Sequence, residues 1–474
     1  MAYSWLPVNI VGQSNESRSK SFSVESTKNL IPEVSPSGRT SSALHNWLGS
    51  IRRLTSASTG KDRGSCVFQD KLYKISGERL YRVDADFTEV EIGTIEGSGR
   101  CIMANDGENI AITTGSTAYN YNGSTLAAIT DTDLENPDSV TVLNNQMIYD
   151  GNRDRWVVAT PGDPTDIPDI NYALAESNGD DLVRVYTFNQ ALYLMGTGTI
   201  ETWYNSGVGN PPFSRVDGGI IETLGLYALH SVANTSTYMY FLASDKNVYR
   251  VTGYQAELIT PPAISHQLFK NAGNDAIATT VNIDAQDFYI LSLPSANKTY
   301  AYSEQFGDWF ELSSGEDESR YIMNSQHFVY GKRLITDYRN GNVLELDYDT
   351  YTDDGQPQIR QRDTQPINGV SLGMPGQKLV MDSFRLIVQT GVGIASGQGS
   401  DPKFFIGTSV DGGRNFDYSG NPYVSIGTGG NYTITVQLDK VLEFEDLVIR
   451  VRCSDPVFIS IHGAAIHVDK GGEW

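Results

Sequence analysis

Between about residues 64 and 350 the chain repeats one pattern of apolar and polar positions. A short apolar strand is followed by a polar turn and then by a second strand that carries aromatic residues. The first two copies lie at residues 71–83 and 109–121. Further copies centre on residues 147–149, 192–194, 238–241, 288–290 and 333–335. The spacing is roughly 37 to 49 residues, which is typical of a propeller blade.

This repeat predicts an all-β protein whose main domain, residues 64–350, is a β-propeller of six or seven blades. A small antiparallel sheet cannot bury both of its faces alone, whereas blades stacked around an axis bury them and leave few exposed edges. Helices are scarce in the pattern, and one short helix is expected near residues 264–269.

The pattern changes after about residue 350. Residues 351–368 are polar and rich in Gln, Asp and Pro, which indicates a linker. Alternating strands then recur at residues 383–388, 403–406, 432–436, 447–452 and 457–461, with glycine turns between them. Short strands at this spacing predict a β-sandwich over residues 369–474.

The first 63 residues have a different composition and predict an extended N-terminal arm. Residues 1–60 carry six Lys and Arg against three Glu, so the acidic excess lies in the rest of the chain. The segment is rich in Ser, Asn and Pro, with isolated apolar anchors. We expect Trp5, Trp47, Arg52 and Arg53 to be assembly contacts of an arm that docks on another protein. The alternative is a segment packed on its own domain.

The formal net charge of the 474 residues is −22, which excludes a high-affinity coat on nucleic acid. An acidic wall can still surround a duplex and let it slide past. The three cysteines form no CxxC pair, so we expect folding in a reducing cytoplasm. The N-terminal residues do not look like a secretory signal, and no apolar run is long enough for a membrane helix, so no membrane insertion is expected.

No catalytic or ligand-binding motif stands out. There is no phosphate-binding GxxxxGK[ST] loop, no GxSxG elbow and no HExxH, so we expect no catalytic residue, no cofactor and no metal site. One sharper motif is an Asp-box, the S-x-D-x-G-x-x-[FW] pattern of sialidase propellers, with Ser409, Asp411, Gly413 and Phe416. It occurs once, outside the propeller repeats, and predicts a stable turn in which Asp411 accepts backbone N–H groups.

Several stretches together resemble the packaged-DNA stabilisation family of lambdoid short-tailed phages, also called tail accessory or tail nozzle proteins. The most specific block is residues 198–207, followed by residues 212–215 and Gly225. Residues 6–9, 28–33, 97–100, 408–412 and 448–451 also resemble the family. A departure is residues 45–50, where a Pro-Gly turn is expected, and this puts the path of the N-terminal arm in doubt.

The resemblance implies a structural virion protein of the phage tail, assembled in the host cytoplasm. It implies a homohexameric ring below the portal and its adaptor that extends the DNA channel. Such a ring would help to retain packaged DNA, attach tail fibres or tailspikes, and contact a tail needle or plug. Duplex DNA would pass through without tight binding.

Two other functions stay open from the sequence. One is a sialidase-like enzyme acting on host surface sugars, which needs three arginines around a carboxylate, a Tyr–Glu pair and several Asp-boxes. The other is a propeller that only binds glycans or a receptor. The number of copies in the assembly distinguishes this binding protein from a nozzle. A receptor-binding protein works alone or as a trimer, whereas a nozzle works as a six-fold ring.

Overall fold

The computed structural model describes residues 4–12, 14, 16–20, 22–34, 42–175 and 179–470. These residues are mainly in strands. Their helices are α1 (Pro262–Asn271) and the short 3-10 turns η1 (Leu229–Ser231) and η2 (Pro294–Ala296). Helix α1 contains the predicted residues 264–269, and it starts with a proline, whose fixed φ suits the first helical position.

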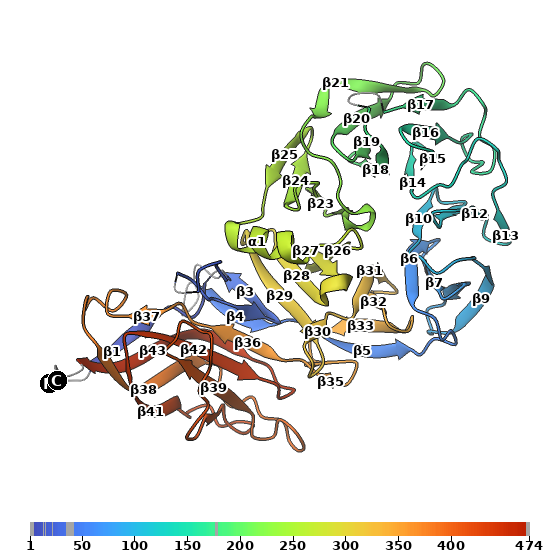
Figure 1. Ribbon diagram of the computed structural model, residues 1–474. Helices are drawn as coiled ribbons and strands as arrows, with labels where there is room; N and C mark the ends of the chain where they lie inside the picture. Colours follow the sequence, from blue (N-terminus) through green and yellow to red (C-terminus); the bar gives the residue numbers. More distant parts are fainter. Residues whose placement is uncertain are drawn as a thin grey trace.

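Seven four-stranded antiparallel units follow one another along the described chain and are arranged around a common axis (Figure 1). The first three units are β6 (Asp62–Phe68), β7 (Lys71–Ser76), β8 (Arg79–Val83) and β9 (Glu89–Thr94); β10 (Ile102–Asn105), β11 (Ile110–Thr113), β12 (Ala118–Tyr121) and β13 (Leu126–Ala128); and β14 (Val140–Leu143), β15 (Gln146–Asp150), β16 (Arg155–Val158) and β17 (Tyr172–Leu174).

The fourth to seventh units complete the ring. They are β18 (Leu182–Phe188), β19 (Ala191–Gly196), β20 (Ile200–Asn205) and β21 (Phe213–Ile221); β22 (Ala233–Asn234), β23 (Met239–Leu242), β24 (Val248–Thr252) and β25 (Gln255–Leu258); β26 (Ile277–Ile283), β27 (Gln286–Leu293), β28 (Lys298–Ser303) and β29 (Asp308–Ser314); and β31 (Met323–Val329), β32 (Lys332–Asp337), β33 (Val343–Asp347) and β5 (Gly49–Leu54).

The first hairpin of most units turns through residues with positive φ. Pairs of such residues join the first two strands at 69–70, 144–145, 189–190, 284–285 and 330–331. Two consecutive positive-φ residues are characteristic of the type I′ turn, whose twist matches that of the flanking strands. These turns fix the register that places alternate strand residues between neighbouring units.

The ring closes between the seventh and first units. Strand β31 lies against β6, and apolar side chains of both units form one buried cluster that includes Leu72 and Leu334. The hydroxyl of Ser65 lies 2.9 Å from Nε2 of His327. The buried Lys74 ammonium donates to the Gly341 carbonyl at 2.7 Å. The outermost strand of the seventh unit is β5, which comes from the N-terminal segment and pairs antiparallel with β33.

Two further sheets lie beside the propeller and share one apolar core (Figure 1). The first contains β1 (Ser4–Val8), β3 (Leu30–Val34), β4 (Ser42–Asn46), β38 (Leu379–Val388), β41 (Val436–Phe444) and β43 (Ser460–Lys470). The second contains β36 (Arg360–Asp363), β37 (Ile367–Asn368), β39 (Lys403–Ser409), β40 (Tyr423–Ser425) and β42 (Asp446–Cys453). Phe384 and Ile466 of the first sheet and Phe404 and Ile449 of the second belong to this core.

The described part of the predicted arm is not extended away from the chain. Strands β1, β3 and β4 belong to the first C-terminal sheet, and β5 completes the propeller. Residues 351–368, predicted to be a linker, also form strands. It contains β34 (Thr352–Asp353), β35 (Gln356–Pro357), β36 and β37, and the four residues of β36 are all buried. Composition misled in both places, because polar side chains here are buried with hydrogen-bond partners rather than solvated.

Replacing Trp47 by Ala should lower the free energy of unfolding by about 3–5 kcal/mol. Its indole is fully buried, and it packs edge-on against Phe288 (centroid distance 5.4 Å) and Tyr321 (6.2 Å). Trp5→Ala is the matched control. That indole is 38% exposed, and its loss should cost only about 1 kcal/mol. Urea unfolding of both variants measures the difference, and equal losses would contradict it.

Candidate functional site

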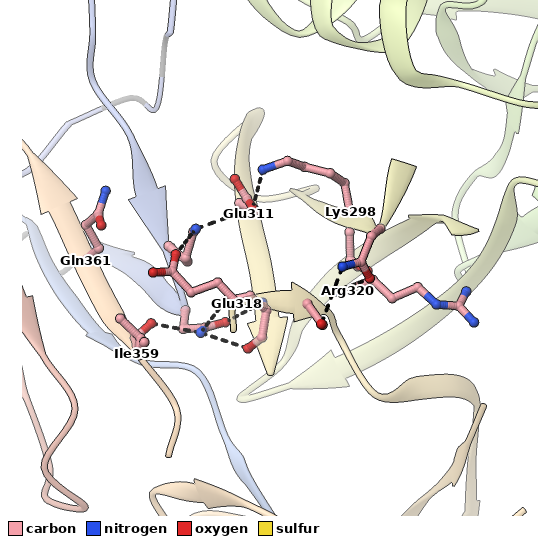
Figure 2. Close-up of polar contacts among 12 residues, drawn as sticks. Lys298, Glu311, Glu318, Arg320, Ile359 and Gln361 are labelled. Carbon is pink, nitrogen blue, oxygen red and sulfur yellow. Dashed lines mark hydrogen bonds and ion pairs between the residues drawn. The ribbon is translucent and has the colours of Figure 1, made fainter. Parts of the chain in front are cut away.

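The propeller and the C-terminal sheets are joined by one short strand, β2 (Thr27–Lys28), which we call the joint strand. It pairs in parallel with β29 of the propeller and antiparallel with β36 of the C-terminal sheet. The sixth propeller unit is therefore continuous with a C-terminal sheet through main-chain hydrogen bonds. Figure 2 shows the polar side chains around this strand.

Asn29, directly after the joint strand, fixes the two bodies to each other. It is fully buried with φ of 53°, a left-handed conformation that asparagine tolerates. Its side-chain amide donates to the carbonyls of Ser313 and Ile359, both at 2.9 Å, and its oxygen accepts the Ser313 N–H at 3.0 Å. Ser313 lies in the propeller and Ile359 precedes β36. One side chain thus bridges both bodies.

Charged side chains surround the same strand. The Lys28 ammonium lies 3.5 Å from Glu311 and also pairs with Glu318. Glu318 pairs in addition with Arg452 of β42. Glu311 pairs with Lys298 at 2.8 Å, a contact drawn in Figure 2. Burial acts to raise the pKa of Glu318, but Lys28 and Arg452 outweigh it and hold that pKa below its usual range. The carboxylate stays charged at neutral pH and connects three segments.

A second buried network lies on the other side of the joint strand. Arg362 of β36 is fully buried, pairs with Glu25 at 2.8 Å and donates to the Ile10 carbonyl at 2.8 Å. The next residue of β36, Asp363, points to the opposite face, the one that carries Lys28, and pairs with Arg450 at 2.7 Å. A buried arginine left without these partners would cost several kcal/mol, roughly 3–5. The network therefore requires the N-terminal segment to lie where it does.

The structure scatters the four predicted assembly contacts. Trp47 is part of the core between the joint and the propeller, so it is not available to a partner. Arg52 pairs with Asp354, and Arg53 pairs with Glu345 at 2.6 Å, so both charges are matched within the chain. Trp5 lies on the outer face of the first C-terminal sheet, stacked on His467 at 4.9 Å and below the Arg385 guanidinium at 4.3 Å.

The Asp-box forms a compact turn after β39. Asp411 accepts the backbone N–H groups of Arg414 and Asn415, both at 2.9 Å, and the Ser409 hydroxyl at 2.7 Å. These hydrogen bonds hold the pKa of Asp411 well below its usual range. Gly413 has φ of 74°, and Phe416 packs under the Arg450 guanidinium at 3.8 Å. The motif is part of the scaffold of the C-terminal sheets.

In the residues that the structure describes, no group of three or more His, Cys, Asp or Glu could hold a metal ion. The three cysteines are buried and unbridged. Glu201, in the most family-specific block, is buried, and its carboxylate accepts the Trp203 indole N–H at 2.8 Å. In the described residues no helix is long and apolar enough to cross a membrane.

Sequence reasoning missed Asn29 and Arg362, the two residues that do most to fix the joint. Asn29 lies in a stretch noted only for family resemblance, and Arg362 in a stretch assigned to a linker. The one available signal was that residues 360–363 alternate two arginines with Gln and Asp. That pattern does not distinguish a solvated strand from a buried one with partners far away in sequence.

The successive four-stranded units, closed by an N-terminal strand, define a β-propeller protein with additional C-terminal sheets. The chain belongs to the family described as bacteriophage P22 Gp10, β-propeller, whose model matches residues 5–351. The fold class and the resemblance seen in the sequence are thereby confirmed at the level of an all-β phage propeller protein. Membership supports a structural role in a phage tail and implies a virion-associated protein.

No curated protein matches the sequence. Among solved structures, the extracellular domain of a one-component system from B. thetaiotaomicron matches at 10% identity and a TM-score of 0.45, over 74% of this chain and 45% of that one. The chain thus spans less than half of that protein. The WD40 propeller domain of Doa1 matches at 11% identity and a TM-score of 0.41, over 63% and 98%.

Replacing Asn29 by Ala should destabilise the joint by about 2–4 kcal/mol, because buried groups of Ser313 and Ile359 lose their partner. Asn144→Ala is a matched control, since Asn144 also has a left-handed φ, 52°, but is exposed. Thermal unfolding and limited proteolysis after residue 350 measure the effect. If both variants lose the same stability, the loss comes from backbone strain and not from the bridge.

The joint also predicts a pH dependence. Burial raises the pKa of Asp308, which accepts the Ser14 N–H at 3.0 Å, to about 6 from an ordinary 3.8. Between these values the native state keeps a proton that the unfolded chain has lost, so the free energy of unfolding falls as pH rises from about 4 to about 6. Asp308→Asn should reduce that fall.

Urea midpoints of the wild type, Asp308→Asn and the exposed control Asp439→Asn at several pH values between 4 and 7 test this. The difference in urea midpoint between the wild type and Asp308→Asn should change with pH. The difference between the wild type and Asp439→Asn should stay constant. Parallel curves for all three proteins would show that Asp308 does not titrate in this window.

Proposed function

We propose that this protein is a non-enzymatic component of a short phage tail that forms a ring, expected to contain six copies, below the portal and its adaptor. The ring extends the DNA channel, helps to retain packaged DNA, attaches tail fibres or tailspikes and contacts a needle or plug. The observation that carries the proposal is the family model over residues 5–351. We take the seven units as the blades of the propeller and the two C-terminal sheets as a β-sandwich.

The joint supports this proposal on mechanical grounds. A continuous sheet, the Asn29 bridge and the ion pairs of Lys28 and Arg362 hold the propeller and the C-terminal sheets in one fixed orientation. A protein that only displays a receptor-binding domain needs no such rigidity. A ring that stays sealed against packaged DNA needs subunits whose two bodies do not move against each other.

The charge supports a conduit. A duplex carries one phosphate per roughly 1.7 Å of axis, and a wall of cations would bind it in a salt-dependent way. With a net charge of −22 the chain opposes such binding and favours passage. Retention then depends on closing the tube with a plug and on sealed contacts between subunits and the adaptor, not on adhesion along the wall.

The contacts with partners need a surface that the chain itself leaves open. Of the four residues predicted from the sequence, Trp5 best meets this condition, because it is presented on a sheet face together with Arg385 and His467. Aromatic and arginine side chains are the residues enriched at binding hot spots. We infer that this face, which we call the Trp5 face, meets the adaptor or a neighbouring copy.

Trp5→Ala should leave a folded protein that joins DNA-filled heads at least about tenfold less well, since a hot-spot residue contributes about 2 kcal/mol or more. Tyr254→Ala is the control, because Tyr254 is an aromatic residue of the propeller with comparable exposure, 45% against 38%. Heads lacking the protein are incubated with each variant, and electron micrographs and released DNA are scored.

We expect the wild type and Tyr254→Ala to form a six-fold ring below the portal, and Trp5→Ala to form none. Normal assembly by Trp5→Ala would show that the Trp5 face is not the contact. A wild-type protein that forms no ring and instead cleaves sialyl glycans, or binds them as a monomer or trimer, would favour the glycan-directed alternative.

A further inference from the structure

Two arginines and a histidine converge near the axis of the propeller, at the ends where the innermost strands begin. Arg100 precedes β10, Arg184 lies near the start of β18, and His230 lies in η1 just before β22. The innermost strands surround the axis in Figure 1. The three residues therefore come from the second, fourth and fifth units and lie at or just before the start of the first strand of each unit.

Hydrogen bonds show how the two arginines reach this position. The Arg100 guanidinium donates to Oδ1 of Asn324 at 2.6 Å and to its carbonyl at 3.2 Å. Asn324 belongs to the seventh unit, so Arg100 reaches past the first unit, which lies between. Arg184 donates through Nη1 to the Leu229 carbonyl at 2.6 Å, directly beside His230. Its guanidinium also lies over the Tyr186 ring, 5.0 Å from the centroid.

The cations in this group are not matched by anions. Within the described residues, neither arginine has a carboxylate partner within ion-pair distance, whereas most of the other buried or half-buried arginines discussed above have one. Arg184 Nε is buried and makes no hydrogen bond. Two guanidinium groups held together in a protein interior repel each other unless a counter-charge is present.

The ionisable groups near Arg100 and Arg184 do not offset this excess of positive charge. Burial lowers the pKa of His230, and repulsion from Arg100 and Arg184 lowers it further. The nearby carboxyl groups are those of Asp62 and Asp150, and burial raises the pKa of both, that of Asp150 to about 8. Asp62 is also occupied by hydrogen bonds from Asn324 and Thr336. The acids that could compensate the arginines are thus held toward their neutral forms.

We propose that Arg100, Arg184 and His230 form a binding site for a small oxyanion, of the phosphate or carboxylate class, at the end of the propeller axis where the innermost strands begin. Guanidinium groups present paired N–H donors that match the oxygens of such an anion. All three residues are half-buried, so water and a small ion can reach them. A bound oxyanion would tie together the second, fourth, fifth and seventh units.

The test compares thermal unfolding and calorimetric titration of the full chain with inorganic phosphate and with acetate, against chloride at matched ionic strength. A site of this kind should raise Tm by on the order of 2–5 °C at saturating phosphate or acetate. Arg184→Gln should reduce the affinity by at least about tenfold. In chloride it should unfold at the wild-type temperature or higher, because it removes a half-buried positive charge that repels Arg100.

Arg79→Gln is the control, since Arg79 is an exposed arginine of the first unit. It should keep the wild-type response. If Arg184→Gln does not fold, His230→Gln provides the second variant, because His230 makes no hydrogen bond in the described structure. A wild-type chain with no oxyanion-specific shift, or an Arg184→Gln or His230→Gln variant with an undiminished response, would overturn the proposal.

Discussion

The structure depends on one constraint: the N-terminal segment must lie between the propeller and the C-terminal sheets. Its joint strand forms main-chain hydrogen bonds with both of them. Asn29 has a left-handed backbone conformation, and its side chain donates hydrogen bonds to the propeller and to the residue that precedes β36. Without that segment the seventh unit lacks β5, the first C-terminal sheet lacks β1, β3 and β4, and Arg362 loses Glu25. Each of these losses exposes apolar surface or leaves a buried charge unpaired.

This constraint explains why the segment has a basic and polar composition without being an arm. Lys28 and Arg52 contribute to ion pairs with acids supplied by the propeller and the residues after it, Glu318 and Asp354. Arg53 of the same segment likewise pairs with Glu345 of the propeller. Under the proposed function, the acidic excess of the rest of the chain suits a conduit for DNA, and the Trp5 face is the proposed contact with partners.

The propeller holds two arginines, Arg100 and Arg184, near its axis. Both lie at the starts of innermost strands in an otherwise acidic chain, and among the described residues neither has a carboxylate within ion-pair distance. Burial raises the pKa of the nearby carboxyl groups of Asp62 and Asp150.

The sequence by itself determined the fold class, the approximate limits of the repeating units and the turn formed by Ser409, Asp411, Gly413 and Phe416. Those features rest on local alternation, on glycine and on hydrogen bonds between residues close in the chain. Only the tertiary structure decided the places of Trp47, Asn29, Arg362 and the axial arginines. Their partners lie up to several hundred residues away, and whether a polar side chain is solvated or buried depends on those partners and not on its neighbours in sequence. The hairpin turns at Asn189 and Asp284 have Gln190 and Ala285 where glycine usually follows, so the Asn-Gly or Asp-Gly signal is absent from the sequence although both residues of each turn have positive φ.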